Sequence, residues 1–203
     1  MKKVFLSLLL GTALLCQAAA QNTPLRHHEW RLGWGDMLFE TLAFHQEGSQ
    51  QYNTHNSDFG YTGHIFLEYR YHLNRVVSLG IQTDFEGIFW NETPVDMYRQ
   101  PTGPSVPIRN YDLSILPTVR LNCLNTDWVR LYGGFAAGLL MAFDNAKNME
   151  LAPAFNITVL GVQVGKGPWS GSLELGPMIS LRNANAIYMF GSRLISVSVN
   201  YSW

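Results

Sequence analysis

Residues 62–90 read TGHIFLEYRYHLNRVVSLGIQTDFEGIFW, a segment in which apolar and polar side chains alternate in two successive runs. The period is two from Thr62 to Leu73 and again from Val76 to Trp90, which is typical of β-strands with unlike faces. Only Asn74 and Arg75 separate the runs, and such a short connection favours a β-hairpin. We therefore expect two long antiparallel strands, each with one polar and one apolar face.

The same alternation recurs along most of the chain. Further strands are expected at residues 29–35, 107–121, 128–141, 155–164, 169–181 and 195–203. The count is thus about eight, and closed single-chain bacterial barrels have even counts. Long connections (36–61, 91–106, 142–154 and 182–186) alternate with short ones (74–75, 122–127 and 165–168), as in up-and-down barrels. The expected fold is all-β: a single up-and-down antiparallel transmembrane β-barrel with both termini at one end.

Three positions interrupt this pattern. Pro117 and Pro177 lie inside expected strands, where each removes a backbone hydrogen-bond donor, so we expect bulges or local breaks there. In the strand at 155–164 the apolar phase shifts between Val159 and Leu160, which also predicts a bulge.

The N-terminus has the pattern of an export signal. Lys2 and Lys3 precede an apolar run at residues 4–15, and three alanines at 18–20 supply a small-residue cleavage site. We expect residues 1–20 to be a cleaved signal peptide and residues 21–203 to form one barrel domain.

Two other interpretations of the N-terminus are less favoured. Cys16 would suit lipidation, but Leu14 and Leu15 stand where a lipoprotein signal needs small residues. A transmembrane anchor needs about 20 apolar residues, and this run is shorter.

Composition favours a membrane barrel over a soluble one. Charged residues make up 14% of the chain, against about 25% in water-exposed domains, and no segment after residue 20 is a transmembrane helix. A soluble lipocalin-like barrel would carry more Lys and Glu on its water face, whereas small and mixed polar residues suit a narrow lumen.

Tryptophans at 30, 34, 90, 128, 169 and 203 lie near strand ends, as in interfacial belts. The formal net charge of −1 gives no reason to expect nucleic acid as a partner.

The export signal, the alternating strands and an aromatic-terminated last strand together resemble the small outer-membrane β-barrel families of Gram-negative bacteria. The sharpest motif is the alternating series Ile195, Val197, Val199, Tyr201 and Trp203. The resemblance implies that Val199, Tyr201 and Trp203 form the assembly signal recognised by the barrel-assembly machinery. It also implies periplasmic chaperones and outer-membrane lipid as partners, and the outer membrane as location. It implies no activity, because these families include adhesins, anchors, narrow pores and lipid-modifying enzymes.

The polar phase of the strands predicts a charge network in the lumen. Its members are Glu68, Arg70, Asp84, Glu86, Asp112, Arg120, Arg130 and Glu174. The arginines fall near the end that holds the termini, with Glu68 and Glu174 slightly further along, which predicts a charge-paired plug. The carboxylates Asp84, Glu86 and Asp112 fall in the other half, where they would share protons, hold a cation or be solvated.

No metal, cofactor or catalytic site is expected. His64 and His72 share one face but are about 26 Å apart along a strand, too far to bind one metal. A lipid A hydrolase would need serine and histidine on the lipid-facing phase, which has neither in the clear strands. His55, Ser57 and Asp58 have the residue types of a nucleophile and base, but polar loops often contain them.

We therefore expect a non-enzymatic outer-membrane barrel whose long extracellular loops serve a structural or surface-interaction role. A narrow pore is the alternative, and a lipid A-modifying enzyme is less favoured.

Overall fold

The structure is a computed structural model that describes residues 25–35, 54–98, 100–144, 148–181 and 194–203. The predicted signal peptide and most of the predicted connections at 36–61 and 182–186 lie outside the described residues. The described residues contain no helix, hence none long and apolar enough to cross a membrane.

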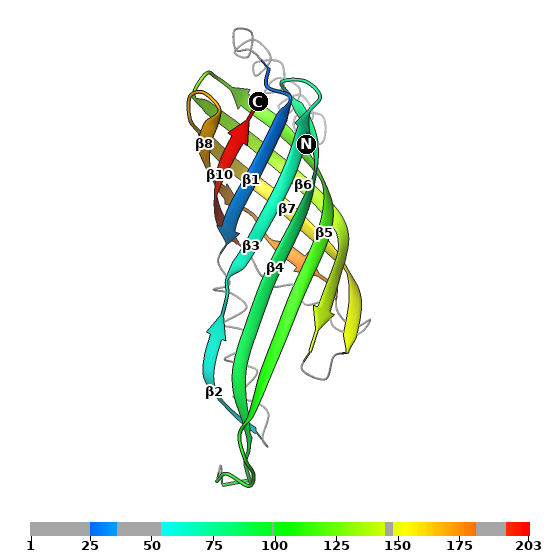
Figure 1. Ribbon diagram of the computed structural model, residues 1–203, viewed down its shortest axis with the longest axis vertical. Coiled ribbons are helices and arrows are strands. Elements are labelled where there is room, and N and C mark those ends of the chain that lie inside the picture. The colour runs from blue at the N-terminus through cyan, green and yellow to red at the C-terminus, as the bar shows by residue number, and fades with distance from the viewer. Residues whose placement is uncertain (1–24, 36–53, 99, 145–147, 182–193) are drawn as a thin grey trace, which may run out of the picture.

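Ten strand segments form the fold, shown in Figure 1. They are β1 (His28–Gly35), β2 (Thr54–Tyr61), β3 (His64–His72), β4 (Val77–Pro94), β5 (Val106–Asn125), β6 (Val129–Phe143), β7 (Met149–Val164), β8 (Trp169–Leu175), β9 (Met178–Ser180) and β10 (Ile195–Ser202). Every pairing is antiparallel, and the order β1-β3-β4-β5-β6-β7-β8-β10 closes when β10 pairs with β1. The predicted eight-stranded antiparallel barrel is confirmed.

The two remaining segments continue barrel strands. β2 precedes β3 in the same direction and pairs with the far part of β4, and β9 follows β8 and pairs with β7. In Figure 1, β2 and the ends of β4 and β5 extend well beyond the ends of β6 and β7. We call this part, β2 with residues 87–94 and 106–111, the extended sheet.

Several predicted connections are shorter than expected. The predicted connection 36–61 contains β2, because its polar residues pair with the end of β4. The connection predicted at 142–154 is mostly strand, since β6 and β7 stay paired as far as Phe143 and Met149. Likewise, β4 continues to Pro94 beyond the predicted boundary at Trp90. The polar side chains of these residues led to the prediction of loops. Strand pairing uses backbone hydrogen bonds, however, and does not require an apolar face.

The irregularities fall close to the predicted positions. Pro117 leaves a gap in the β5–β6 ladder, which resumes in the same register at Thr118, so there is a local break and no bulge. At Pro177 the strand is interrupted between β8 and β9, after Gly176 at φ 154°. The β6–β7 register shifts between Thr158 and Gly161, which confirms the predicted bulge.

The short connections and both termini of the barrel meet at one end, which we call the terminal end. His28 and Trp203 exchange backbone hydrogen bonds of 3.2 and 3.0 Å, and Gly165 donates to the carbonyl of Trp128 at 2.9 Å. The opposite end, which carries the extended sheet, is called the hairpin end. The up-and-down arrangement predicted from connection lengths is therefore confirmed.

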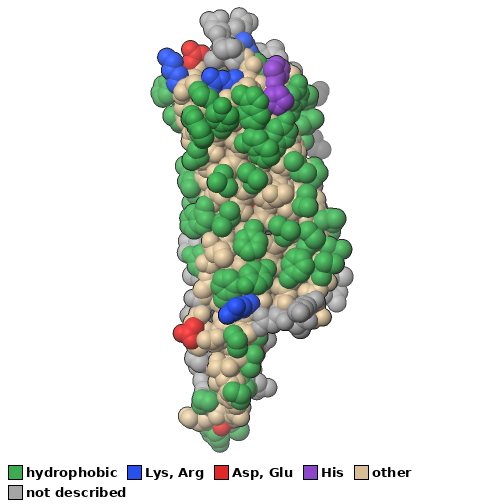
Figure 2. Space-filling view, in the orientation of Figure 1, with side chains coloured by type: hydrophobic (Ala, Val, Ile, Leu, Met, Phe, Trp, Pro, Cys, Tyr) green, Lys and Arg blue, Asp and Glu red, His purple; other side chains and the backbone are tan. Residues whose placement is uncertain are grey.

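Alternate residues face the lumen and the outer wall, in the predicted phase. In β10 the residues from Ile195 to Tyr201 are alternately exposed and buried, with Asn200 at 0% exposure. In β4, Ile81 is 46% exposed on the wall and Gln82 only 3% exposed in the lumen. Figure 2 shows hydrophobic side chains covering the middle of the wall, with charged groups near its ends.

Aromatic rings gather toward the two ends of the wall. At the terminal end, Tyr201 contacts both Trp169 and Trp203, with ring centroids 4.8 and 5.7 Å apart. Toward the hairpin end, Tyr111 packs against Phe85 and Phe89 at 6.1 and 5.6 Å. Such placement is typical of interfacial belts.

Two large rings fit inside the lumen because each faces a glycine on the neighbouring strand. Phe66 pairs with Gly33, and Tyr132 pairs with Gly161. A Cβ at either glycine would collide with the facing ring. The glycines therefore make room for aromatic packing in a narrow interior.

Candidate functional site: the barrel lumen

Buried ion pairs fill the half of the lumen nearest the terminal end. Glu68 binds two arginines, Arg31 through Oε2 and Arg70 through Oε1, both at 2.6 Å. Arg31 also contacts Glu174 at 2.9 Å, and Arg70 contacts Glu29 at 2.9 Å. All five side chains are at most 5% exposed. Together with Arg120, they are called the arginine cluster.

Neutral side chains bind further groups of the cluster, although the Nε of Arg70 is buried without a hydrogen-bond partner among the described residues. Arg31 donates from Nε to Asn200 at 3.1 Å and from Nη2 to Ser198 at 3.0 Å. The hydroxyl of Thr118 donates to Glu68 at 3.0 Å, and that of Tyr132 donates to Glu174 at 2.9 Å. These bonds matter because a buried ion pair offsets its desolvation only when its other lone pairs and protons are also bonded.

Arg120 joins the cluster by three kinds of contact. It donates from Nη2 to Gln163 at 2.7 Å and approaches Glu29 at 3.5 Å. Its guanidinium also stacks on Tyr132, 3.1 Å from the ring centroid. The arginine cluster thus draws residues from β1, β3, β5 and β8, with Tyr132 of β6 and Gln163 of β7 around it.

A second polar group lies on the β3–β4–β5 wall, toward the hairpin end. His64 contacts Asp84 through Nε2 at 2.7 Å and Glu86 through Nδ1 at 3.3 Å. Ser114 donates to the other oxygen of Asp84 at 2.6 Å. His64, Asp84 and Glu86 are 0%, 1% and 4% exposed, so these carboxylates are not open to solvent. Asp112 lies opposite Glu86 in the strand register.

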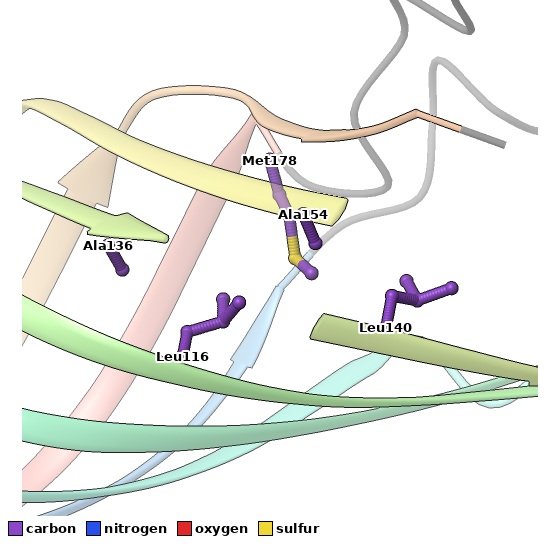
Figure 3. Close-up of a cluster of buried hydrophobic side chains, with 5 residues drawn as sticks. All are labelled: Leu116, Ala136, Leu140, Ala154 and Met178. Atoms are coloured by element: carbon purple, nitrogen blue, oxygen red, sulfur yellow. The ribbon is translucent and has the colours of Figure 1, made fainter. Parts of the chain in front are cut away.

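An apolar plug lies on the wall formed by β5, β6, β7 and β9. It consists of Leu116, Ala136, Leu140, Ala154 and Met178, each at most 3% exposed. Figure 3 shows these side chains projecting into the shared interior. The plug predicted from the sequence is a charged one, and this apolar part was not expected, although Leu116 and Leu140 occupy inward positions of their strands.

The cavity that remains in the arginine cluster is small. It measures about 20 Å³ and is bordered by Arg31, Glu68 and Arg120. This is about the space that one water molecule occupies. The cluster therefore leaves little free volume between opposite walls.

The predicted charge network divides into two groups. Glu68, Arg70, Arg120 and Glu174 belong to the arginine cluster, whereas Asp84 and Glu86 surround His64. Arg130 lies at the edge, 3.7 Å from Glu29.

The prediction omitted three central residues, Glu29, Arg31 and His64. The first two alternate with Trp30, Leu32 and Trp34, so their inward phase was readable in the sequence. His64 lies on the same face of its strand as Glu68 and Arg70, so its inward phase was readable as well. Its carboxylate partners follow only from the β3–β4 register.

One contact has the residue types of a hydrolase triad. His72 lies 2.6 Å from Ser78 through Nδ1 and 3.6 Å from Glu29 through Nε2. Ser78 is 0% exposed and His72 is 2% exposed, so a substrate cannot reach the hydroxyl. We interpret the contact as part of the lumen packing.

The C-terminal strand closes the barrel. In β10, Val199 and Tyr201 pair with β1 on one side and with β8 on the other. The side chains of Val199, Tyr201 and Trp203 are 58%, 39% and 47% exposed on the outer wall. Their role in assembly remains a prediction.

Solved structures similar to this chain include the Yersinia pestis outer membrane protein Ail in a phospholipid bilayer nanodisc, with 12% sequence identity and a TM-score of 0.37. The similarity covers 88% of this chain and 100% of that chain. No protein-family model and no curated protein matches the sequence.

Proposed function

We propose that this chain is a non-enzymatic outer-membrane β-barrel with a closed lumen and a surface-interaction role. The proposal rests on one observation: polar and apolar side chains lie on opposite faces of one closed sheet. Ion-paired residues fill the lumen, while large apolar side chains such as Leu32 and Val199, 60% and 58% exposed, cover the wall. Exposed apolar surface of this extent is costly in water and favourable in lipid.

Membrane location is tested by fractionation and by a folding assay. The protein should be recovered from purified outer membranes and should migrate faster on gels before boiling than after it. The purified chain should fold only when lipid or detergent is present. Folding in plain buffer would refute the membrane assignment.

A closed lumen follows from the arginine cluster and the apolar plug. Eight strands enclose an interior that side chains can fill, and here they fill it with paired charges and large rings. Planar-bilayer recording of the refolded protein should therefore show no steady conductance. Reproducible unitary currents would favour the narrow pore instead.

We propose that the chain is not an enzyme, because the serine and histidine side chains that meet in its lumen are inaccessible to a substrate. Ser78 and His72 are buried, and the lipid-facing phase offers no serine–histidine pair among the described strands. Expression of the protein should leave the mass spectrum of lipid A unchanged. A new lipid A species that depends on the chain would overturn this part of the proposal.

The extended sheet is the proposed interaction surface. Among the described strands, β2 pairs only with β4, and residues 106–110 of β5 also pair only with β4. This sheet therefore continues past the ends of β6 and β7, away from the terminal end of the barrel. Replacing residues 88–110, which form the outer parts of β4 and β5, with a two-residue turn should abolish adhesion or aggregation of expressing cells without lowering barrel levels. Unchanged adhesion would place the interaction elsewhere.

A further inference from the structure

We propose that a cavity at the terminal end binds a phosphate group, supplied by the headgroup of an anionic phospholipid in the adjoining leaflet. The lipid source rests on the proposed membrane location, whereas the anion site does not. The cavity measures about 240 Å³ and lies between Arg26, the connection before β6 and the connection between β7 and β8.

The charge of the cavity favours an anion. Arg26, Arg130 and Lys166 line it from three separate segments, and Asp127 is its only carboxylate lining residue. Within the described chain, Arg26 and Lys166 form no ion pair, and Arg130 forms one, 3.7 Å from Glu29. Glu29 is already shared with Arg70 at 2.9 Å. The cations are therefore incompletely neutralised, and phosphate oxygens accept charge-assisted bonds from such groups.

The hydroxyl group of Ser170, which lines the cavity, adds a neutral donor. The Oγ of Ser170 accepts hydrogen bonds from Gln163 at 2.8 Å and from Asn200 at 3.3 Å. Its own hydrogen has no acceptor among the hydrogen bonds of the described residues. Because its oxygen already accepts two bonds, the hydroxyl is suited to donate to a ligand in the cavity.

The position of the cavity favours a lipid headgroup over a free ion. Trp128 lines the cavity and is 63% exposed, and Trp169 and Trp203 lie at the same end of the wall. Such rings settle at the level of the headgroups. A phosphate held by Arg26 and Lys166 would therefore lie at the depth of the neighbouring lipid headgroups.

The first test compares vesicles. Wild type, the double variant Arg26→Gln/Lys166→Gln and the control Arg75→Gln are refolded in phosphatidylcholine with and without phosphatidylglycerol. Arg75 is a cation in the β3–β4 turn at the same end and does not line the cavity. Phosphatidylglycerol should raise the urea midpoint of wild type and Arg75→Gln equally, and the double variant should lose most of this rise. Equal losses in both variants would show diffuse surface attraction and overturn the site.

The second test needs no membrane and separates the site from the proposed function. In neutral detergent micelles, inorganic phosphate should shift the backbone amide resonances of Lys166 and Gly167 saturably in wild type and not in the double variant. Shifts here without any phosphatidylglycerol effect would support the anion site and identify free phosphate as its occupant. No effect in either arm would overturn the proposal, even for a barrel that proves to be in the outer membrane.

Discussion

Arg31 and Glu68 face each other across the β1–β3 pair and form an ion pair of 2.6 Å, with both side chains 1% exposed. The pair joins the first two strands of the barrel at a point where neither group can be solvated. Because Glu68 also binds Arg70, one carboxylate compensates two arginines.

Glu68→Gln should strongly destabilise the barrel. The change leaves Arg31 with Glu174 and Arg70 with Glu29 as their carboxylate partners, and breaking a buried ion pair costs about 3–5 kcal/mol. The free energy of unfolding should be measured from urea curves in lipid vesicles. Glu150→Gln, at an exposed position of β7, is the control and should behave like wild type. Similar midpoints for Glu68→Gln and wild type would show that the arginine cluster is not structural.

Arginine should be tolerated better inside the lumen than on the wall. Ile81→Arg places a charge on the outer wall, at roughly 2–4 kcal/mol near the bilayer midplane. Gln82→Arg instead enters a lumen where Glu68 is its cross-strand neighbour and Asp84 lies on the same face. In vesicles, Ile81→Arg should lower the urea midpoint more than Gln82→Arg. The reverse order would mean that the two faces are assigned incorrectly.

Cysteine labelling should establish the orientation in the membrane. Cys123 lies in β5, beside the register shift toward β6, and not in the turn predicted from the sequence. The test therefore uses Met97→Cys and Asp127→Cys in a Cys123→Ser background, since these positions lie at opposite ends. A membrane-impermeant thiol reagent should label Met97→Cys in intact cells. It should label Asp127→Cys only after the outer membrane is permeabilised, and the opposite result would invert the topology.

Trp203→Ser should impair assembly more than folding. The ring of Trp203 stacks on His28 at 5.3 Å, but its backbone hydrogen bonds to His28 do not need the ring. We therefore expect lower outer-membrane levels and periplasmic degradation in cells, with refolding in detergent largely retained. Trp169→Ser, at the same end of the neighbouring strand, is the control for loss of an interfacial ring. Equal outer-membrane levels for Trp203→Ser and wild type would argue against an assembly signal.

Gly33→Ala should destabilise the barrel, because an aromatic ring packs against this glycine in the lumen. The added Cβ would collide with the ring of Phe66 and with the carbonyl oxygen of Val197, and overpacking costs roughly 1–3 kcal/mol. Gly171→Ala is the control, because its Cβ would lie 3.9 Å from the nearest oxygen. In Gly33→Ala/Phe66→Ala the two effects on the unfolding free energy should be less than additive. Strictly additive effects on the unfolding free energy would show that Gly33 and Phe66 do not interact.

The eight barrel strands and their inward and outward phase were predictable, because alternation is a local property of each strand. The eight-stranded barrel and the inward direction of Glu68, Arg70, Asp84 and Glu174 follow from that pattern. The predicted bulge after Thr158 also follows, since a phase shift is visible in the sequence itself.

The partners of these residues depended on register and ring closure, which no local pattern encodes. Arg31 reaches Glu68 on β3 and Glu174 on β8 only because β10 closes the barrel against β1. The extended sheet was unforeseen, because polar residues 54–61 pair with β4 through their backbone rather than through an apolar face. The alternation of side chains thus sets which residues enter the lumen, and the closed hydrogen-bonded ring sets which of them meet.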